Sequence, residues 1–288
     1  MAHEFTTLTL EIERGVATAT FSRPDKMDAF NRAALEDMLA LFDRTDADDA
    51  VKVLIVTGSG RAFCAGADLA AAGAATFDYT KRQQAGEDVP RDGGGRLTLR
   101  IFDSRKPVIC AVNGAAVGIG ATMQLPMDIR IASTTARFGF VFTRRGVVPE
   151  ACSSWFLPRI VGISTALEWC ATGRVFSAEE ALARGLVRSL HAPDELMPAA
   201  NALAREIADN TAPVSVAITR QMLWRMLGAA HPMAAHRVDS RAMTARGKSA
   251  DAREGIASFL EKRPANFTDR VSAGLPDVFP EWEEPEFR

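Results

Sequence analysis

Two glycine turns are the parts of this 288-residue sequence whose residue types are best suited to chemistry. The first, 61–69, reads RAFCAGADL, and the second, 112–121, reads VNGAAVGIGA; each follows a short apolar run. Glycine lets a chain turn with its N–H groups outward, and it lets a ligand approach the backbone closely. Two such turns on neighbouring strands can aim two N–H groups at one oxygen, as in an oxyanion hole. The loss of one such donor typically costs about 2.7–4 kcal/mol of transition-state stabilisation, so each donor contributes strongly to catalysis. The two turns therefore indicate an enzyme.

Other chemistries fit the sequence less well. Gly118-Ile119-Gly120 is superficially similar to a dinucleotide-binding loop, but residue 123 is Met where that fingerprint requires Gly. The four cysteines show no CxxC spacing, so we expect buried free thiols in a reducing cytoplasm and no metal site. Cys64 lies beside a glycine turn, but all four histidines are remote from it in sequence. An inert buried cysteine is the commoner case.

Composition places the chain among ordinary soluble globular proteins. Hydrophobic residues make up 47% and charged residues 24%, and the formal net charge is −2, so nothing favours a nucleic-acid partner. The first residues, MAHEFTTLTLEIE, do not read as a signal or transit peptide. No apolar run approaches the ~20 residues needed to cross a bilayer. We therefore expect a cytoplasmic protein with no membrane partner.

The elements that must position the two turns follow from apolar patterning. Strands are predicted at 8–12, 16–21, 53–56, 108–112, 129–132 and 185–190. Helices are predicted after the capping residue Asn31, at 96–103, at 118–127, after Pro149 and across most of 194–263. This alternation favours an α/β fold with one central core, followed by a helical C-terminal region.

Residues 70–95 interrupt the pattern. They contain an alanine-rich stretch, a mixed polar stretch, and Pro90-Arg91-Asp92 followed by three glycines. We interpret this segment as a mobile insertion and a candidate lid.

Several motifs, in the right order, make the sequence similar to the enoyl-CoA hydratase/isomerase, or crotonase, superfamily. The motifs are AFCAGADL at 62–69, VNGAAVGIGA at 112–121, RPDKMDAFN at 23–31, FSAEEALARGLV at 176–187 and FLEKRPANF at 259–267. The resemblance spans roughly residues 5 to 267. It implies a crotonase-like spiral of ββα units in 1–205 that binds acyl-CoA. It further implies a helical trimerisation region with an extended tail in 206–288, and a homotrimer or a dimer of trimers.

The resemblance also implies roles for individual residues. By motif position, the oxyanion donors are the N–H groups of Ala67 and Ile119. The backbone of Ala65 and Gly66 is expected to hold the coenzyme near its adenine and pantetheine. The other residues expected around the substrate are Met27, Ala29, Asp68, Leu69, Gly118, Thr122, Phe142 and Trp155. The substrate is a coenzyme A thioester, and no permanently bound cofactor is expected.

Two of these residues have a second interpretation. Asp68 is expected to order its own turn, because Asp commonly bonds nearby backbone. Lys262 is expected to approach the coenzyme phosphates, from its own or a neighbouring subunit. The alternative for Lys262 is a solvated charge at the end of a helix, since lysine is mostly exposed.

The sequence departs from the family at the two glutamates with which typical hydratases position and split a water. Thr122 and Phe142 occupy those positions, and neither can act as a general base near neutral pH. A different carboxylate, Glu150 in VPEACSSWFLPRIVG at 148–162, stands where the peroxisomal 3,2-enoyl-CoA isomerases carry their catalytic glutamate. The related chlorobenzoyl-CoA dehalogenases place a nucleophilic aspartate there. The alternative is that Glu150 caps a helix at 151–161.

The leading hypothesis is therefore an enoyl-CoA isomerase of fatty-acid or related acyl breakdown. Glu150 would remove a proton from carbon 2 and return it to carbon 4. An apolar wall of Phe140, Phe142 and Trp155 would exclude water and raise the pKa of Glu150. A second hypothesis is an enoyl-CoA hydratase in which Glu150 activates water. A third is an acyl-CoA-binding protein without turnover, motivated by the missing glutamates.

Overall fold

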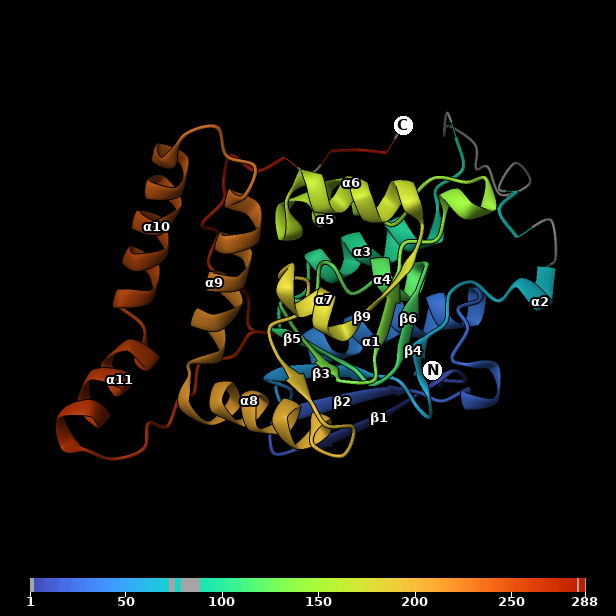
Figure 1. Cartoon of the computed structure of the whole chain (residues 1–288). Helices are drawn as coiled ribbons and strands as arrows, with labels where there is room; N and C mark the ends of the chain where they lie inside the picture. Colours follow the sequence, from blue (N-terminus) through green and yellow to red (C-terminus); the bar gives the residue numbers. More distant parts are fainter. Residues whose placement is uncertain (1–2, 73–75, 79–88, 284, 288) are drawn as a thin grey trace.

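The computed structural model describes residues 3–72, 76–78, 89–283 and 285–287, and two β-sheets form its centre (Figure 1). The larger sheet has six strands in the order β1-β2-β3-β5-β7-β10. They are β1 (Leu8–Glu13), β2 (Val16–Phe21), β3 (Val53–Thr57), β5 (Val108–Val112), β7 (Ile129–Ser133) and β10 (Leu190–His191). β1 and β2 are antiparallel, whereas the later neighbours in this sheet are parallel.

The smaller sheet alternates with the larger one along the chain. Its order is β4-β6-β8-β9, with β4 (Ala62–Cys64), β6 (Ala115–Val117), β8 (Arg137–Gly139) and β9 (Val175–Ser177). In the successive pairs β3–β4, β5–β6 and β7–β8, the first strand joins the larger sheet and the second joins the smaller one. Helices follow each pair, so the chain repeats a ββα unit. This repetition confirms the predicted α/β class and the predicted spiral.

The helices of the spiral lie between and after these strand pairs. In chain order they are the 3₁₀ turn Pro24–Lys26, α1 (Arg32–Ala47), α2 (Leu69–Ala72), α3 (Gly93–Phe102), α4 (Ile119–Thr122), the 3₁₀ turn Thr143–Arg145, α5 (Ser153–Val161), α6 (Ile163–Thr172) and α7 (Ala178–Ala183). The predicted cap of α1 is confirmed, because the Asn31 side chain accepts a hydrogen bond from the N–H of Ala34 at 2.9 Å.

Both faces of the larger sheet are buried. Successive side chains of a strand point to opposite faces. Leu54 and Val56 of β3 therefore join the main core with the apolar sides of α1 and α3. Val53 and Ile55 pack on the other face against α8 (Leu196–Asn210), which contributes alanines at every fourth position. The continuous apolar run at 53–56 is explained by this two-sided burial.

The last three helices stand beside the sheets, on the opposite side of the molecule from α2 (Figure 1). They are α9 (Pro213–Met226), α10 (Pro232–Gly247) and α11 (Ala250–Glu261). The buried Arg220 of α9 attaches them to the spiral, because its guanidinium donates to the carbonyl oxygen of Phe102 at 2.7 Å and pairs with Asp128 at 2.8 Å. The boundary expected at 205/206 falls inside α8.

Three predicted elements differ from the structure. The strand predicted at 185–190 is limited to Leu190–His191, because Gly185 turns the chain with a φ of 77°. The helix predicted at 118–127 ends at Thr122. The helix predicted from residue 96 begins at Gly93, so the three glycines that were assigned to the insertion form its first turn. Residues 73–75 and 79–88 of the predicted lid lie outside the described residues. Among the described residues, no helix combines the length and apolar character needed to span a membrane.

Candidate active site

The two glycine turns touch each other at the ends of β4 and β6, which are parallel neighbours. Gly66 has a φ of 107° and Gly118 a φ of 56°, conformations that residues with a side chain rarely adopt. A Cβ atom on Gly66 would lie 3.1 Å from the carbonyl oxygen of Val117, and one on Gly118 would lie 3.8 Å from Cα of Gly66. The positive φ favours glycine at both positions, and at Gly66 the close approach to Val117 favours it as well.

The residues that follow these glycines have free backbone donors. The adjacent backbone N–H groups are paired. The N–H of Asp68 donates to the carbonyl oxygen of Phe30 at 2.9 Å, and that of Gly118 donates to the carbonyl oxygen of Gly139 at 2.9 Å. Ile119 is the first residue of α4, whose first N–H groups have no acceptor within the helix. Among the described residues, neither Ala67 nor Ile119 donates its N–H to a backbone oxygen. Both residues line the same cavity.

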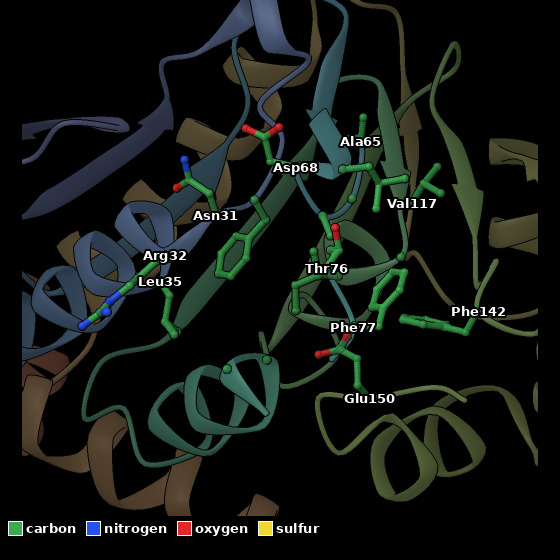
Figure 2. Close-up of a pocket in the computed structure, with 18 of the residues that line it drawn as sticks. Asn31, Arg32, Leu35, Ala65, Asp68, Thr76, Phe77, Val117, Phe142 and Glu150 are labelled. Atoms are coloured by element: carbon green, nitrogen blue, oxygen red, sulfur yellow. The ribbon is translucent and has the colours of Figure 1, made fainter. Parts of the chain in front are cut away.

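This cavity has a volume of about 1070 Å³ and lies between the glycine turns, the first turns of α1 and α3, and Glu150. Phe30, Leu35, Phe77 and Phe142 give it apolar walls. Figure 2 shows Glu150 below Phe77 and Phe142, at the end of the pocket away from Asp68. Its size suits a small-molecule site, and the backbone amides and the Glu150 carboxyl group give it polar groups to orient a ligand.

The Glu150 carboxyl group is held on two sides. Its Oε1 accepts a hydrogen bond from the Thr122 hydroxyl at 2.7 Å. Its Oε2 lies against the first turn of α3, where a Cβ atom on Gly94 would come within 1.7 Å of it. Burial raises the pKa of Glu150 to about 8; the Thr122 hydrogen bond opposes this rise, and the neighbouring carboxyl group of Asp92 adds to it. A carboxyl group with such a pKa can both donate and accept a proton near neutral pH.

The backbone after Glu150 shows that this residue is not a helix cap. Ala151 and Cys152 both adopt left-handed conformations, with φ values of 60° and 53°, and α5 begins only at Ser153. Non-glycine residues in this region are uncommon and strained, and such strain clusters at functional sites. The alternative that Glu150 caps a helix at 151–161 is therefore wrong, because its side chain points to Thr122 and α3 instead.

Asp92 is a residue of the site that sequence reasoning missed. It is the N-cap of α3, and its Oδ1 accepts hydrogen bonds from the N–H of Gly95 at 2.5 Å and of Ala151 at 3.2 Å. Asp before Gly-Gly-Gly was interpreted as part of an irregular insertion. The available signal was its type, since Asp is a favoured N-cap residue just before a helical segment.

Nine of the fourteen predicted site residues line the cavity: Ala65, Gly66, Ala67, Asp68, Leu69, Gly118, Ile119, Phe142 and Glu150. Asp68 forms an ion pair with Arg23 at 3.0 Å, which ties the first glycine turn to the loop before α1. Among the described residues, the Asp68 side chain therefore bonds a distant arginine and not the backbone of its own turn.

The other five lie elsewhere. Thr122 is fully buried behind Glu150, and Met27 and Ala29 lie in the loop before α1. Trp155 packs on Phe102 and Phe156, with ring centroids at 6.1 and 4.8 Å, so it belongs to an aromatic cluster and not to the cavity. Phe140 likewise stacks on Trp169 in the core, which leaves Phe142 as the member of the predicted wall that reaches the cavity. Lys262 ends α11, away from the cavity of its own chain.

The described cavity wall also contains four arginines that were not predicted as site residues: Arg32, Arg91, Arg96 and Arg145. They add positive charge to the cavity wall, although Arg32 is paired with Glu36 at 2.7 Å. Cys64 is fully buried, and burial raises the pKa of its thiol to about 12, which excludes it as a nucleophile near neutral pH. Among the described residues, no three His, Cys, Asp or Glu side chains are grouped to hold a metal ion.

Comparison with known proteins agrees with this geometry. Residues 11–270 match the family model "Enoyl-CoA hydratase/isomerase". The chain is 42% identical over 258 residues to the enoyl-CoA hydratase AFT3-1 of Alternaria alternata, covering 89% of this chain and 84% of that protein. It is 34% identical over 267 residues to the 1,2-epoxyphenylacetyl-CoA isomerase of Escherichia coli (strain K12), covering 90% and 97%.

Solved structures show the same fold. The crystal structure of an enoyl-CoA hydratase from Bacillus anthracis superposes with a TM-score of 0.82 at 26% identity, covering 91% of this chain and 99% of that one. Together with the contacting glycine turns and the cavity that they line, these matches show that the chain belongs to the enoyl-CoA hydratase/isomerase, or crotonase, superfamily and is an enzyme of that class.

Proposed function

We propose that this acyl-CoA enzyme moves the double bond of an enoyl-CoA from the 3- to the 2-position, with Glu150 as its acid/base. The observation that carries the proposal is the position of Glu150, whose carboxyl group lines the cavity shared with Ala67 and Ile119 and has a pKa raised to about 8.

The reaction needs one charge to be stabilised. The free N–H groups of Ala67 and Ile119 bind the thioester oxygen and stabilise the negative charge that develops on it. Removal of a proton from carbon 2 breaks the C2–H bond, forms an O–H bond on Glu150 and leaves a dienolate. Oriented donors in a cavity shielded from water typically provide a large part of such stabilisation.

The same carboxyl group completes the reaction. Its proton passes to carbon 4, where a C–H bond forms as the O–H bond breaks, and the conjugated thioester results. One carboxyl group suffices because the two carbons are close together. Phe142 and Phe77, which lie next to Glu150 in Figure 2, keep water away from the dienolate.

Turnover of a 3-enoyl-CoA by wild type and by Glu150→Gln tests this role, because Gln keeps the shape but cannot transfer the proton. General acid–base catalysis typically contributes ~10²–10⁴-fold, and we expect a rate loss in that range. Glu179→Gln, an exposed carboxylate at the start of α7, is the matched control. Equal rates for wild type and Glu150→Gln eliminate the proposed role.

Hydration of a 2-enoyl-CoA is the second candidate function. The names of the relatives favour it, since the proteins that are 41–42% identical over 258 residues are called enoyl-CoA hydratases. In this function Glu150 activates a water for addition to carbon 3. Hydration of crotonyl-CoA and of longer 2-enoyl-CoA substrates tests it, and an absence of product at every chain length rejects it.

The assembly and the location of the enzyme belong to the same proposal. Exposed apolar side chains on α11, including Ile256, Phe259 and Leu260, support a homotrimer or dimer of trimers. In such an assembly Lys262 of a neighbouring copy approaches the coenzyme phosphates. Four free cysteines support a reducing cytoplasm as its location. Analytical ultracentrifugation tests the oligomer, and a monomer contradicts it.

A further inference from the structure

The segment before α3 brings a second carboxyl group to Glu150. Thr122 and Phe142 occupy the positions at which the family resemblance implies two catalytic glutamates, so the sequence offers Glu150 as the candidate acid/base. In the structure, Oδ1 of Asp92 accepts a hydrogen bond from the N–H of Ala151, the residue next to Glu150, at 3.2 Å, and the Asp92 carboxyl group contributes to the raised pKa of Glu150. The two acids come from segments 58 residues apart in the chain, the N-cap of α3 and the loop before α5.

Asp92 is rigidly placed for this contact. One oxygen, Oδ1, accepts from the N–H of Gly95 inside α3 and from the N–H of Ala151, the residue directly after Glu150. Through these two hydrogen bonds, Asp92 holds the strained backbone at 151–152 against the first turn of α3. Gly94 leaves the space into which Glu150 fits, since any Cβ there would overlap Oε2.

We propose that Asp92 is the positioning residue of the Glu150 acid/base: it holds the backbone next to Glu150 against α3, and its charge makes Glu150 a stronger base. A neighbouring like charge disfavours the ionised form of Glu150 and so favours uptake of a proton by this group. Ionised Glu150 accepts the proton from carbon 2, as the C2–H bond breaks and the O–H bond forms. Neutral Glu150 then passes this proton to carbon 4 of the dienolate.

The other groups around Glu150 do not raise its pKa in the way that the charge of Asp92 does. Thr122 from α4 donates a hydrogen bond, which acts in the opposite direction. The thiols of Cys64 and Cys152 have raised pKa values and are neutral at neutral pH. The other charged side chains of the described cavity wall are Arg32, Glu36, Asp68, Arg91, Arg96 and Arg145. Among the described residues, Asp92 is the charged group that acts on the pKa of Glu150.

This inference deepens the role proposed for Glu150, so its test has a readout that does not need turnover. Protein labelled with ¹³C at the glutamate carboxyl carbon is titrated by NMR, and the Glu150 signal is identified by its loss in Glu150→Gln. Asp92→Asn and Asp92→Ser are compared with wild type. Both substitutes are good N-caps, so α3 keeps its acceptor while the charge is lost.

We expect the titration midpoint of Glu150 to fall by at least about one pH unit in both variants, because a like charge is removed. The acid limb of the pH profile of kcat/KM for a 3-enoyl-CoA moves to lower pH by the same amount. The value of kcat at the pH optimum falls by about tenfold or more, since the weaker base removes the proton less readily. Asp43→Asn, which removes an exposed carboxylate paired with Arg100 of α3, is the matched control and leaves the midpoint unchanged.

A capping role alone predicts that Asp92→Asn and Asp92→Ser titrate like wild type, and that result overturns the proposal. If the midpoint shifts but wild type does not isomerise a 3-enoyl-CoA, the effect of Asp92 on Glu150 stands and the proposed function is rejected instead. If one of the two variants fails to fold, the comparison uses the variant that folds. An unchanged Glu150 midpoint in that variant also overturns the proposal.

Discussion

The hydroxyl group of Thr122 donates a 2.7 Å hydrogen bond to Oε1 of Glu150. Thr122 is fully buried, and its side chain holds the carboxyl group that we propose as the acid/base. Because the hydrogen bond favours the ionised form, it lowers the pKa of Glu150 and partly offsets the effect of burial.

Replacing Thr122 by Val is expected to raise the pKa of Glu150. Val keeps the shape of the side chain but cannot donate, and a hydrogen bond to a charged group contributes about 1.5–3 kcal/mol. Since one pKa unit corresponds to about 1.36 kcal/mol, the acid limb of the kcat/KM profile should move up by about one unit or more. Thr45→Val in α1, where the hydroxyl meets only backbone carbonyl oxygens, is the control. A limb that stays in place or moves down contradicts the prediction.

Gly94→Ala is expected to abolish most of the activity although alanine favours helices. A Cβ at this position would lie 1.7 Å from Oε2 of Glu150 and 2.8 Å from Cδ1 of Ile119, so the acid/base must move. Misplacement of a catalytic group by about 1 Å can cost about 10²-fold. The matched control is Gly247→Ala in α10, where a Cβ meets nothing within 4 Å and the change should be neutral or stabilising. Isomerisation rates and circular dichroism spectra measure both effects.

The spiral core could be predicted because its signals are local. The apolar runs at 53–56 and 108–112 are strands that are buried on both faces, and Asn31 caps α1 as its type indicates. The glycine turns were found for the same reason, since a positive φ and a close approach of two backbones leave glycine as the residue that fits.

The parts that were missed depend on contacts between distant segments. Asp92 and Gly94 are separated from Glu150 by more than 50 residues, and nothing local shows that α3 packs against the loop before α5. Trp155 was expected in the cavity because it follows Glu150 closely. Two left-handed residues, Ala151 and Cys152, redirect the chain at that point and turn Trp155 toward Phe102.

Stability should depend on pH through Glu150. Burial raises its pKa from the ordinary 4.5 to about 8, so the folded protein keeps a proton that the unfolded chain releases. The stabilising contribution is complete below about pH 4.5 and is lost as the pH rises through about 8. Glu150→Gln lacks this dependence. The Tm of the variant minus that of wild type should therefore increase between these two pH values, and a difference that is constant across the window refutes the prediction.

Arg220→Met should strongly destabilise the protein. The guanidinium is 4% exposed and pairs with Asp128 at 2.8 Å, and it also donates to the carbonyl oxygens of Ile101, Phe102 and Ser104 at 2.7–2.8 Å. Asp128, whose side chain is 17% exposed, also accepts from the indole N–H of Trp224 and the N–H of Val108, so it stays in place when Arg220 is removed. The removal also leaves the three carbonyl oxygens without this donor. Breaking a buried pair by removing one partner typically costs about 3–5 kcal/mol.

Urea unfolding measures this loss, with Arg237→Met as its control. Arg237 lies on α10 with its side chain 60% exposed and 3.7 Å from Glu281, so its removal should change the free energy of unfolding by about 0.5 kcal/mol or less. Arg220 joins α9 to the C-terminal end of α3, the helix whose first turn holds Glu150 in place. If the midpoint of Arg220→Met equals that of Arg237→Met, the C-terminal helices are attached to the spiral by other contacts.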